Sequence, residues 1–406
     1  MASVAVLGYG TVGSGVVEVL QKNADEITRK SGVRIDVKYI LDIREFPGDP
    51  NEKAIVHDFA VIENDPEVKV VAEAMGGLHP AYDFTKKALE AGKSVCTSNK
   101  ELVAEFGNEL REIAAAHGVS YLYEASCGGG IPIIRPLRNA LTADVIIGLS
   151  GIFNGTTNFI LTRMEKEGHD YADVLAEAQA MGYAERNPAA DVEGHDTCRK
   201  LAILASLAYG VQLSYKDIRT EGITKITAAD IAYASSMGYK IKLLGISCRC
   251  GDQVEAVVLP AMIGSETPLY AVDDVFNAIL VRGNMLDDVM FYGKGAGKLP
   301  TGSAVASDVI EAVVSDGKCG IIPQGEPVKP VDPETMSYRF FVRIAENAAD
   351  AKAKVEAAFA GAQQVCLAEY PQESGFVTDV MTEKVFAEKI AALDGVLGCI
   401  RILPTE

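Results

Sequence analysis

The chain has 406 residues and is strongly acidic, with 56 Asp and Glu against 38 Lys and Arg, a formal net charge of −18 and a pI near 4.8. Such a surface repels phosphate backbones and anionic lipids, so we expect no nucleic acid and no membrane partner. Hydrophobic residues make up 48% of the chain, an ordinary globular composition, and the length suggests about two or three domains. A small anionic ligand is still compatible with this net charge, because such a ligand contacts a few local hydrogen-bond donors and not the whole surface.

The termini and cysteines indicate a cytoplasmic protein. Residues 1–7 form a short apolar run that ends at Gly8 and lacks the basic region and apolar length of a signal peptide. No stretch approaches the roughly 18 apolar residues of a membrane-spanning helix. The eight cysteines are scattered, and the close pair Cys248 and Cys250 has poor spacing for zinc. We therefore expect reduced thiols and no histidine metal site.

Strands and helices alternate over the first part of the chain. The pattern predicts strands at 3–7, 34–42, 68–72, 94–97 and 119–123, separated by helices at 11–29, 81–91 and 100–117. This alternation implies right-handed βαβ units and a mostly parallel sheet.

The pattern changes after about residue 130. We expect helices near 132–140, 155–167, 170–181, 191–209 and 301–315, and strands at 239–247, 254–260 and 289–292. A second α+β domain is the simplest interpretation, followed by a proline-rich linker. Beyond it the order is strand 338–344, helix 346–360, strands 363–369 and 376–381, helix 383–393 and strand 396–403. This βαββαβ order is that of a ferredoxin-like module.

The first predicted strand runs directly into Gly8-Tyr-Gly-Thr-Val-Gly13. A GxGxxG between a strand and a helix predicts a dinucleotide site. Gly8 permits the tight turn, Gly10 lets the pyrophosphate approach the backbone, and Gly13 allows close helix–strand packing. The helix N-terminus, with Thr11 and Val12, supplies N–H donors to the phosphates. The alternative is a tight strand–helix turn without a ligand.

The end of the second strand bears on the choice between NAD and NADP. Asp42 there suits the ribose 2′-OH of NAD, and Arg44 suits the 2′-phosphate of NADP. Both residue types are present, so either cofactor, or both, is compatible with the sequence. Arg44 could equally be a solvated loop charge.

A turn at 98–100 follows the strand 94–97 and opens a helix. In a doubly wound sheet such a turn lies at the carboxyl edge, where ligands bind. Ser98 and Lys100 are therefore expected near the junction of cofactor and substrate. A lysine in the first turn of a helix is electrostatically unfavourable, which favours function over a surface role.

The most informative segment precedes and opens the helix predicted at 191–209. Asp196 and Lys200 are spaced i,i+4 and share one face where the helix becomes apolar all round. A lysine entering a buried segment can be tuned for proton transfer, because burial lowers its pKa and a carboxylate raises it. Glu185 and Asp191 lie on the preceding loop and would suit a substrate ammonium group; ordinary loop acids are the alternative.

Together with further motifs, these residues resemble those of the homoserine dehydrogenase family. The resemblance rests on motifs that occur in order over about the first 320 residues. They are Gly8-Tyr-Gly-Thr-Val-Gly-Ser-Gly15, Thr97-Ser-Asn-Lys-Glu101, Glu124-Ala-Ser-Cys-Gly-Gly-Gly-Ile-Pro132, Gly151-Ile-Phe-Asn-Gly-Thr-Thr-Asn158, Gly182-Tyr-Ala-Glu-Arg-Asn-Pro-Ala-Ala-Asp191, Gly194-His-Asp-Thr-Cys-Arg-Lys200 and Gly293-Lys-Gly-Ala-Gly297. The resemblance implies NAD(P)-dependent interconversion of L-homoserine and L-aspartate 4-semialdehyde, in threonine and methionine biosynthesis.

The resemblance also implies roles for individual residues. Lys200 would donate and accept the proton at the substrate oxygen, and Asp196 would bind substrate and support Lys200. Glu185 would hold the substrate amino group with Asp191 nearby, and Thr156 would sit beside the substrate. Lys100 would lie between nicotinamide and substrate, and Gly297 would approach the cofactor.

A monovalent-cation site made largely of backbone carbonyls is a further implication of the resemblance. It maps onto Glu124, Cys127, Gly129 and Ile131, and oxygen donors suit a hard cation such as Na⁺. A glycine-rich hinge between two domains is the alternative for this segment.

The C-terminal segment resembles the ACT-type regulatory module attached to many such enzymes. Its first helix lacks the usual Pro-Gly-Val-Leu opening and reads instead from Glu346 to Lys354. The missing opening favours a dimerising role for the module over the binding of threonine, which is the candidate effector. The family implies a homodimer or homotetramer, and the exposed sheet edges of such modules also favour association.

We therefore expect an α/β protein with a Rossmann-type parallel-sheet domain, an α+β substrate and dimerisation domain, and a C-terminal ACT-like module. The expected division is 1–130 plus 295–320 for NAD(P) binding, 131–294 for substrate and dimerisation, 321–336 as linker and 337–406 as the module. Two rival functions are an aspartate-semialdehyde dehydrogenase using Cys127 as nucleophile and a non-catalytic nucleotide-sensing regulator.

Overall fold

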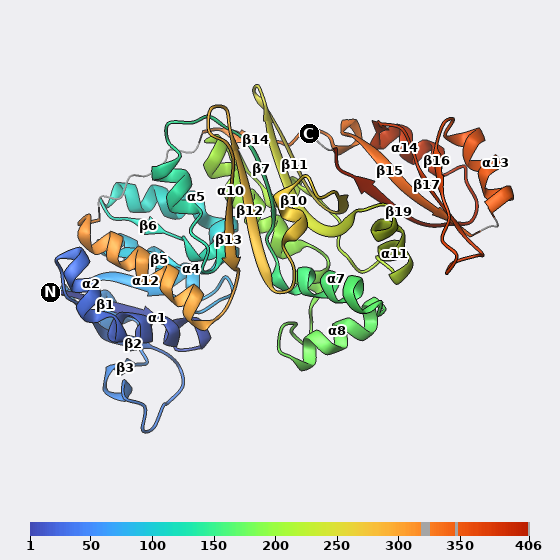
Figure 1. Ribbon diagram of the computed structural model, residues 1–406. Helices are drawn as coiled ribbons and strands as arrows, with labels where there is room; N and C mark the ends of the chain where they lie inside the picture. The colour runs from blue at the N-terminus through green and yellow to red at the C-terminus, as the bar shows by residue number, and fades with distance from the viewer. Residues whose placement is uncertain (318–324, 346–347, 405–406) are drawn as a thin grey trace. The chain divides into compact units, whose positions relative to one another are not determined.

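The computed structural model describes residues 1–317, 325–345 and 348–404, which fall into two compact units (Figure 1). The first unit comprises Met1–Val145, Ala202–Ser214 and Phe291–Pro327, and the second comprises Ile146–Leu201, Tyr215–Met290 and Val328–Glu406. The expectations for linker residues 321–324 and for the helix opening at 346–347 lie outside the described residues.

The first unit is built on a parallel sheet, as the alternation of strands and helices predicts. Its order is β3-β2-β1-β4-β5-β6, and every neighbouring pair is parallel. The strands are β1 (Ala2–Leu7), β2 (Ile35–Leu41), β3 (Ile55–Val56), β4 (Val68–Glu73), β5 (Ser94–Thr97) and β6 (Tyr121–Leu122). Because β1 pairs with both β2 and β4, the strand order reverses beside β1, which makes the carboxyl end of β1 the switch point of the sheet.

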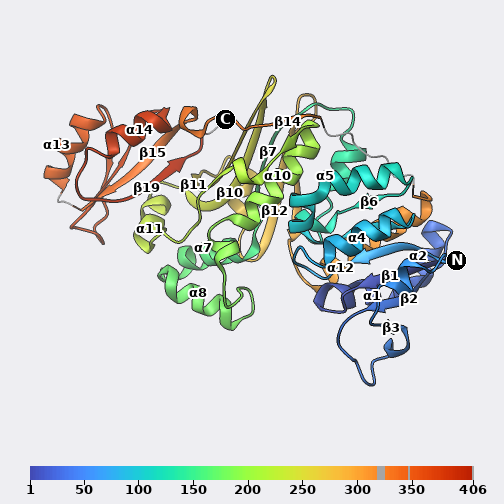
Figure 2. The same ribbon diagram turned by 180° about the vertical axis from the view of Figure 1, so that it is seen from behind.

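Helices cover both faces of this sheet (Figure 1 and Figure 2). The pair α1 and α12 packs on one face and α4 and α5 pack on the other. The helices of the unit are α1 (Thr11–Lys22), α2 (Ala24–Ser31), α3 (Ala60–Glu63), α4 (Ala81–Glu90), α5 (Lys100–Ala116), α6 (Ala125–Gly128) and α12 (Lys298–Val314). Val16 and Leu20 of α1 join Val305 and Val309 of α12 in one apolar core with the sheet. The Rossmann-type fold is thereby confirmed.

The second unit carries a mixed sheet of eleven strands that includes the C-terminal segment. Its main strands run in the order β13-β12-β7-β10-β11. The strands are β7 (Ile146–Ile152), β9 (Arg219–Thr220), β10 (Lys240–Cys250), β11 (Gln253–Ile263), β12 (Phe276–Gly283) and β13 (Asp287–Lys294), and the helices are α7 (Gly155–Glu167), α8 (Tyr171–Ala180), α9 (Ala189–Val192), α10 (His195–Tyr209) and α11 (Ala228–Ser236). Helix α10 and strand β13 begin in this unit, and their residues from Ala202 and from Phe291 onward belong to the first unit.

The C-terminal segment has the predicted βαββαβ order. It contains β15 (Ser337–Ile344), α13 (Ala348–Ala358), β16 (Gln363–Val365), β17 (Ser374–Val377), β18 (Met381–Thr382), α14 (Glu383–Ile390) and β19 (Val396–Ile402). The strand order β19-β15-β17-β16 continues the large sheet, because β19 pairs in parallel with β11 through Arg401 and Ile402. A short pair, β8 (Gln212–Leu213) and β14 (Pro327–Val328), forms a separate ribbon.

Three predicted helices are shorter or broken in the structure. The helix expected at 11–29 is divided at Asn23, a residue that competes with the helix backbone for hydrogen bonds. The helix expected at 191–209 is interrupted by Gly194, whose φ of +83° is left-handed, so that α10 begins only at His195. At 132–140 only a π-helical turn at Pro136–Ala140 forms, since prolines cannot donate within a helix.

The longest elements that the sequence did not predict are strands β7 and β12 and helix α11. Strands β7 and β12 pair with each other in the second unit, and neither shows strict alternation of apolar and polar residues. Helix α11 begins with a capping box in which Thr227 and Asp230 exchange hydrogen bonds. That signal was present in the sequence. Among the helices of the described residues, none combines the length and apolar character needed to cross a bilayer.

Candidate active site

The glycine loop between β1 and α1 has the backbone of a dinucleotide turn. Gly8 adopts a left-handed φ of +87°, and a methyl group on it would lie 3.0 Å from the Ala74 carbonyl oxygen. A methyl group on Gly13 would lie only 1.8 Å from the carbonyl oxygen of Gly8, so this position demands glycine for the fold itself. At Gly10, by contrast, such a methyl group would meet none of the described atoms within 4 Å. The space over Gly10 is therefore available to a phosphate group.

The start of α1 provides the donors that such a phosphate needs. The helix begins at Thr11, and its N-cap residue is Gly10, which has no side chain to accept from the first-turn amides. Amides in the first turn of a helix lack acceptors within the helix and carry the positive end of its dipole. The site therefore fits an anionic dinucleotide.

Asp42 and Arg44, just after β2, form an ion pair. The Arg44 side chain donates from Nε and Nη2 to the Asp42 carboxylate, both at 2.9 Å. The Tyr9 amide donates to the same carboxylate at 2.8 Å, which ties it to the glycine loop. These donors, Arg44 first, hold the pKa of Asp42 well below its ordinary value. The carboxylate is thus ionised, and both of its oxygens already accept hydrogen bonds from Arg44 and Tyr9. The Arg44 side chain is exposed, which leaves its guanidinium accessible to a 2′-phosphate.

The turn after β5 lies at the same carboxyl edge of the sheet. Asn99 caps α5 by accepting from the Leu102 amide at 3.1 Å, and its Nδ2 donates to the Gly77 carbonyl at 2.6 Å. Lys100 is the first residue of α5 and is half-buried, with Ser98 half-buried just before it. Ser98 and Lys100 therefore sit at the edge where the glycine loop lies.

Gly297 lies at the start of α12, beside the glycine loop. It has a φ of +127°, and α12 begins at the next residue. A methyl group on Gly15 of α1 would come within 2.3 Å of the Lys298 carbonyl oxygen, so α1 and α12 approach very closely. The start of α12, which Gly297 precedes, thus lies close against α1.

The second unit brings Lys200 and Asp196 together in its interior. Lys200 Nζ donates to Asp196 Oδ2 at 2.7 Å and to the Phe153 carbonyl oxygen at 2.7 Å. Both side chains are buried, with exposed fractions of 9% and 2%. The helix beyond them, from Leu201 to Ala205, is buried on all sides, as predicted. A buried ammonium needs such partners, and two acceptors fix its position.

Two asparagines that the sequence did not single out complete this centre. Asn154 Nδ2 donates to Asp196 Oδ2 at 2.9 Å and to Asp191 Oδ1 at 2.7 Å. Asn277 of β12 donates to the Phe153 carbonyl at 2.8 Å, the same oxygen that Lys200 contacts. Asn154 lay within the recognised motif and could have been proposed. For Asn277 the sequence held no signal, because its strand was not predicted.

The remaining predicted substrate residues lie around the loop before α9. The Thr156 hydroxyl donates to the Tyr183 carbonyl at 2.6 Å, which joins the start of α7 to this loop. Glu185, two residues further on, has an exposed side chain. Asp191, held by Asn154, is half-buried. Glu185 has an exposed carboxylate, and Asn154 holds the Asp191 carboxylate near that of Asp196. These oxygens suit an ammonium group.

The segment proposed for a cation lies in the first unit and is buried. The Glu124 carboxylate accepts from the amides of Ile133, Ile134 and Arg135 at 2.6, 2.8 and 2.7 Å, so its oxygens serve the backbone. Backbone carbonyl oxygens of the segment are the kind of ligand that a hard monovalent cation prefers. Among the described residues no cluster of three or more His, Cys, Asp or Glu side chains could hold a metal.

Cys127 is poorly placed to act as a nucleophile. Its side chain is fully buried and contacts Ser126 Oγ at 3.5 Å. Four of the five histidines contact other groups: His57 the Asp42 carbonyl, His79 Asp83, His117 the Ile113 carbonyl and His169 Glu167. A thiol that is fully buried cannot reach a substrate, so it is not expected to react.

We therefore expect iodoacetamide treatment of the folded protein to leave the turnover of homoserine that the resemblance implies unchanged. The exposed thiols Cys250 and Cys366 react, while Cys127 is shielded. Residual activity is measured alongside mass spectrometry of the modified peptides. Loss of activity in proportion to modification of Cys127 would favour the rival chemistry.

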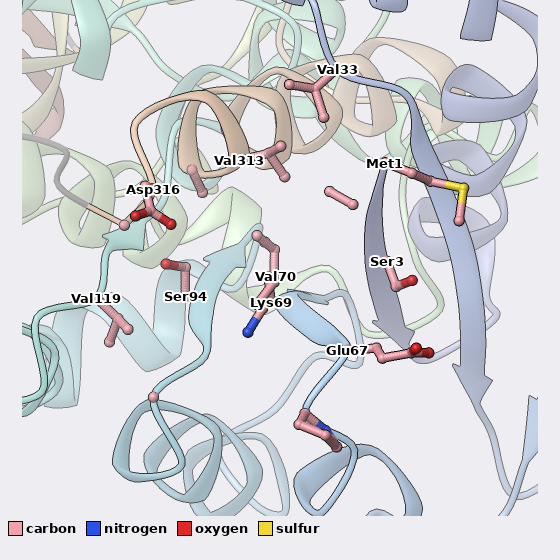
Figure 3. Close-up of a pocket in the computed structure, with 15 residues that line it drawn as sticks. Met1, Ser3, Val33, Glu67, Lys69, Val70, Ser94, Val119, Val313 and Asp316 are labelled. Atoms are coloured by element: carbon pink, nitrogen blue, oxygen red, sulfur yellow. The ribbon is translucent and has the colours of Figure 1, made fainter.

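A surface pocket of about 520 Å3 lies at the opposite edge of the first sheet (Figure 3). Ser3, Lys69 and Ser94 line it near the starts of β1, β4 and β5, and Asp316 lies after α12. Ligands of parallel sheets bind at the carboxyl edge, so this amino-edge pocket lies away from the glycine loop. We assign it no part in the reaction.

Two family models match consecutive parts of the chain. One, described as the NAD binding domain of homoserine dehydrogenase, matches residues 8–124. The other, described as homoserine dehydrogenase, matches residues 132–310. Together they cover the glycine loop, the Lys100 turn and the Asp196–Lys200 helix start.

Known proteins of the same description match over most of their length. The chain is 44% identical to a homoserine dehydrogenase of Pseudomonas aeruginosa over 311 residues, 76% of this chain and 72% of that protein. It is 36% identical to one of Neisseria gonorrhoeae over 422 residues, 98% and 96% of the two chains. A crystal structure of a homoserine dehydrogenase from Thiobacillus denitrificans superimposes with a TM-score of 0.88 at 36% identity and covers 100% of this chain and 99% of that one. A hyperthermophilic archaeal homoserine dehydrogenase in complex with NADPH superimposes at 0.67 with 25% identity, covering 79% and 99%.

Proposed function

Since the chain belongs to the homoserine dehydrogenase family, we propose that its Lys200 and Asp196 manage the proton in the interconversion of L-homoserine and L-aspartate 4-semialdehyde. The enzyme is an oxidoreductase with an NAD(P)-binding domain. The observation that carries the proposal is the Lys200 ammonium held between Asp196 and the Phe153 carbonyl inside the second unit.

The proton transfer follows from the chemistry of that pair. When bound, NAD(P) supplies or accepts the hydride at the carbon that bears the substrate oxygen. In the reductive direction, Lys200 donates a proton to that oxygen as negative charge develops on it. In the oxidative direction, the neutral amine takes the proton back. Asp196 and the Phe153 carbonyl hold Nζ in place throughout, and Asn154 orients Asp196.

The substrate ammonium is proposed to bind the acids of the second unit. Glu185 would contact it directly, with Asp191 nearby, and Thr156 would fix the loop that carries Glu185. On the cofactor side, Ser98, Lys100 and Gly297 would face the dinucleotide together with the residues of the glycine loop. The direct test is an assay of homoserine oxidation with NAD⁺ and with NADP⁺. If neither NAD⁺ nor NADP⁺ were reduced in the presence of homoserine, the proposal would be contradicted.

The Asp42–Arg44 ion pair supports use of both NADP and NAD, because it places an acid and an arginine together after β2. We expect Arg44→Ala to raise the KM for NADP⁺ about tenfold, because a charge-assisted contact to the 2′-phosphate is lost. The KM for NAD⁺ should change little. Steady-state kinetics with the two cofactors at saturating homoserine measure the effect.

Asp42→Ala is the matched control for this pair. It removes the ribose acceptor and releases Arg44, so the preference should move towards NADP⁺. Equal changes in the two cofactor KM values for Arg44→Ala would contradict the assignment of Arg44.

Further parts of the proposal concern features outside the reaction centre. The carbonyls of Glu124, Cys127, Gly129 and Ile131 would hold Na⁺. The division into 1–130 plus 295–320, 131–294, linker 321–336 and module 337–406 remains our proposal for the domains, and the βαββαβ order supports it for the module. The module would either bind threonine or join subunits of a homodimer or homotetramer, and titration calorimetry with threonine separates the two roles. The described cysteines are reduced, which supports a cytoplasmic location.

A further inference from the structure

Glu73 is a buried carboxyl group at the switch point of the first sheet. It is the last residue of β4, and β4 lies between β1 and β5, with Glu73 paired to Leu7 on one side and to Thr97 on the other. Its exposed fraction is 0%. Nothing in the proton chemistry of Lys200 uses it. A charged side chain is rarely buried in this way unless donors surround it.

The donors around Glu73 come from two different loops. Oε1 accepts from the Met75 amide at 2.8 Å, and the Gly76 amide also hydrogen-bonds to the carboxylate. Oε2 accepts from the Thr97 hydroxyl at 2.5 Å. Burial raises the pKa of Glu73, whereas these three donors lower it. The direction of the Thr97 hydrogen bond is set independently, because the Asn99 amide donates to Thr97 Oγ1 at 2.9 Å.

The first of the two loops that Glu73 joins borders the dinucleotide turn. The first, 74–77, lies against Gly8. A methyl group added to Gly8 would lie 3.0 Å from the Ala74 carbonyl oxygen. The second, 97–99, contains Ser98 and leads into Lys100, the first residue of α5. Asn99 closes the connection by donating to Gly77 at 2.6 Å, so the two loops are joined twice.

We propose that Glu73 is a positioning residue for the cofactor: through Met75, Gly76 and Thr97 it holds the loops after β4 and β5 together at the edge where the nicotinamide half of the dinucleotide binds. Cofactors of such sheets bind outside the carboxyl ends at the switch point. Displacement of a bound reactant by a small distance is costly to turnover, so the loops must be fixed. The proposal rests on NAD(P) binding at the glycine loop and is independent of the role of Lys200.

The test replaces the Thr97 hydroxyl without changing the shape of the side chain. Thr97→Val leaves the Glu73 carboxylate and the Asn99 amide without their partner. We expect the KM for NADP⁺ to rise about fivefold or more and kcat to fall, since an unpaired buried group costs on the order of a tenfold change in an equilibrium. The KM for homoserine should change by less than about twofold, because the protein carboxylates proposed to bind homoserine lie in the second unit.

Controls separate positioning from mere stability. Thr97→Ser keeps the hydroxyl and should restore the wild-type constants. Thr85→Val removes another fully buried hydroxyl from the same unit, in α4, and should leave all kinetic constants unchanged. Glu73→Gln keeps the size and one acceptor oxygen, and should raise the KM for NADP⁺ about threefold even if Thr97→Val does not fold.

Kinetic constants and melting temperatures of all four variants are measured together. A fall in melting temperature for Thr97→Val and Glu73→Gln without a rise in cofactor KM would overturn the proposal. An equal rise in the KM values for NADP⁺ and homoserine would do the same. If wild-type enzyme oxidised no homoserine at all, the proposed function would fail, whereas binding of NADP⁺ to the variants, measured by fluorescence, would still decide the role of Glu73.

Discussion

Replacing Lys200 with methionine should lower the turnover of homoserine by about three orders of magnitude while leaving NAD(P) binding unchanged. Methionine fills a similar volume but donates no proton, and it leaves Asp196 and the Phe153 carbonyl without their ammonium. The dinucleotide loop belongs to the first unit, so its affinity should not respond. Steady-state kinetics give the first quantity, and titration of nicotinamide fluorescence gives the second.

Lys242 offers a matched control for this substitution. It is a second buried lysine of the same unit, with an exposed fraction of 1%, and it contacts Asn158, Asp273 and the Val272 carbonyl. Lys242→Met should lower the melting temperature but leave kcat per folded molecule near that of the wild type. Near-normal turnover in Lys200→Met, or an equal loss in both variants, would argue against Lys200 as the proton carrier.

Gly13→Ala should abolish cofactor binding and destabilise the first unit together. The added methyl group would lie 1.8 Å from the Gly8 carbonyl oxygen, a contact that only movement of the strand–helix turn can relieve. We expect a loss of about 3 kcal/mol in the free energy of unfolding, as for other overpacked sites. Denaturant unfolding and cofactor titration measure the two effects.

Two other glycines separate the fold requirement from the ligand requirement. Gly10→Ala meets no described atom within 4 Å, so stability should be kept while cofactor affinity falls, because the methyl group occupies the approach of the pyrophosphate. Gly107→Ala lies inside α5, where alanine favours the helix, and should affect neither binding nor turnover. Full cofactor affinity in Gly10→Ala would contradict the placement of the pyrophosphate.

The sequence predicted those features whose physical cause is local. The GxGxxG turn depends on neighbouring residues, so Gly8, Gly10 and Gly13 could be assigned from their spacing and from the strand before them. Lys200 and Asp196 could be paired for the same reason, since residues four apart share a face of a helix. The family resemblance supplied the reaction, which the comparisons confirmed.

Features that depend on contacts between distant segments could not be predicted. Strands β7 and β12 were missed because a strand buried on both faces lacks alternation and resembles a buried helix. With β12 missing, Asn277 could not be brought to the Phe153 carbonyl. The link between β19 and β11, which joins the C-terminal segment to the large sheet, likewise depends on residues about 140 positions apart.

The sequence by itself determined the fold class, the reaction and the chemical groups that this enzyme brings to it. The tertiary structure decided how those groups are held: Lys200 between Asp196 and a backbone carbonyl, Asp42 closed by Arg44, and Glu73 between two loops. The physical reason is that the chemistry of a residue is carried by its side chain, whereas its partners are set by chain segments that meet only when the sheets form. The charge of −18 describes the surface as a whole, and the reaction depends on a few buried charges that this total does not reveal.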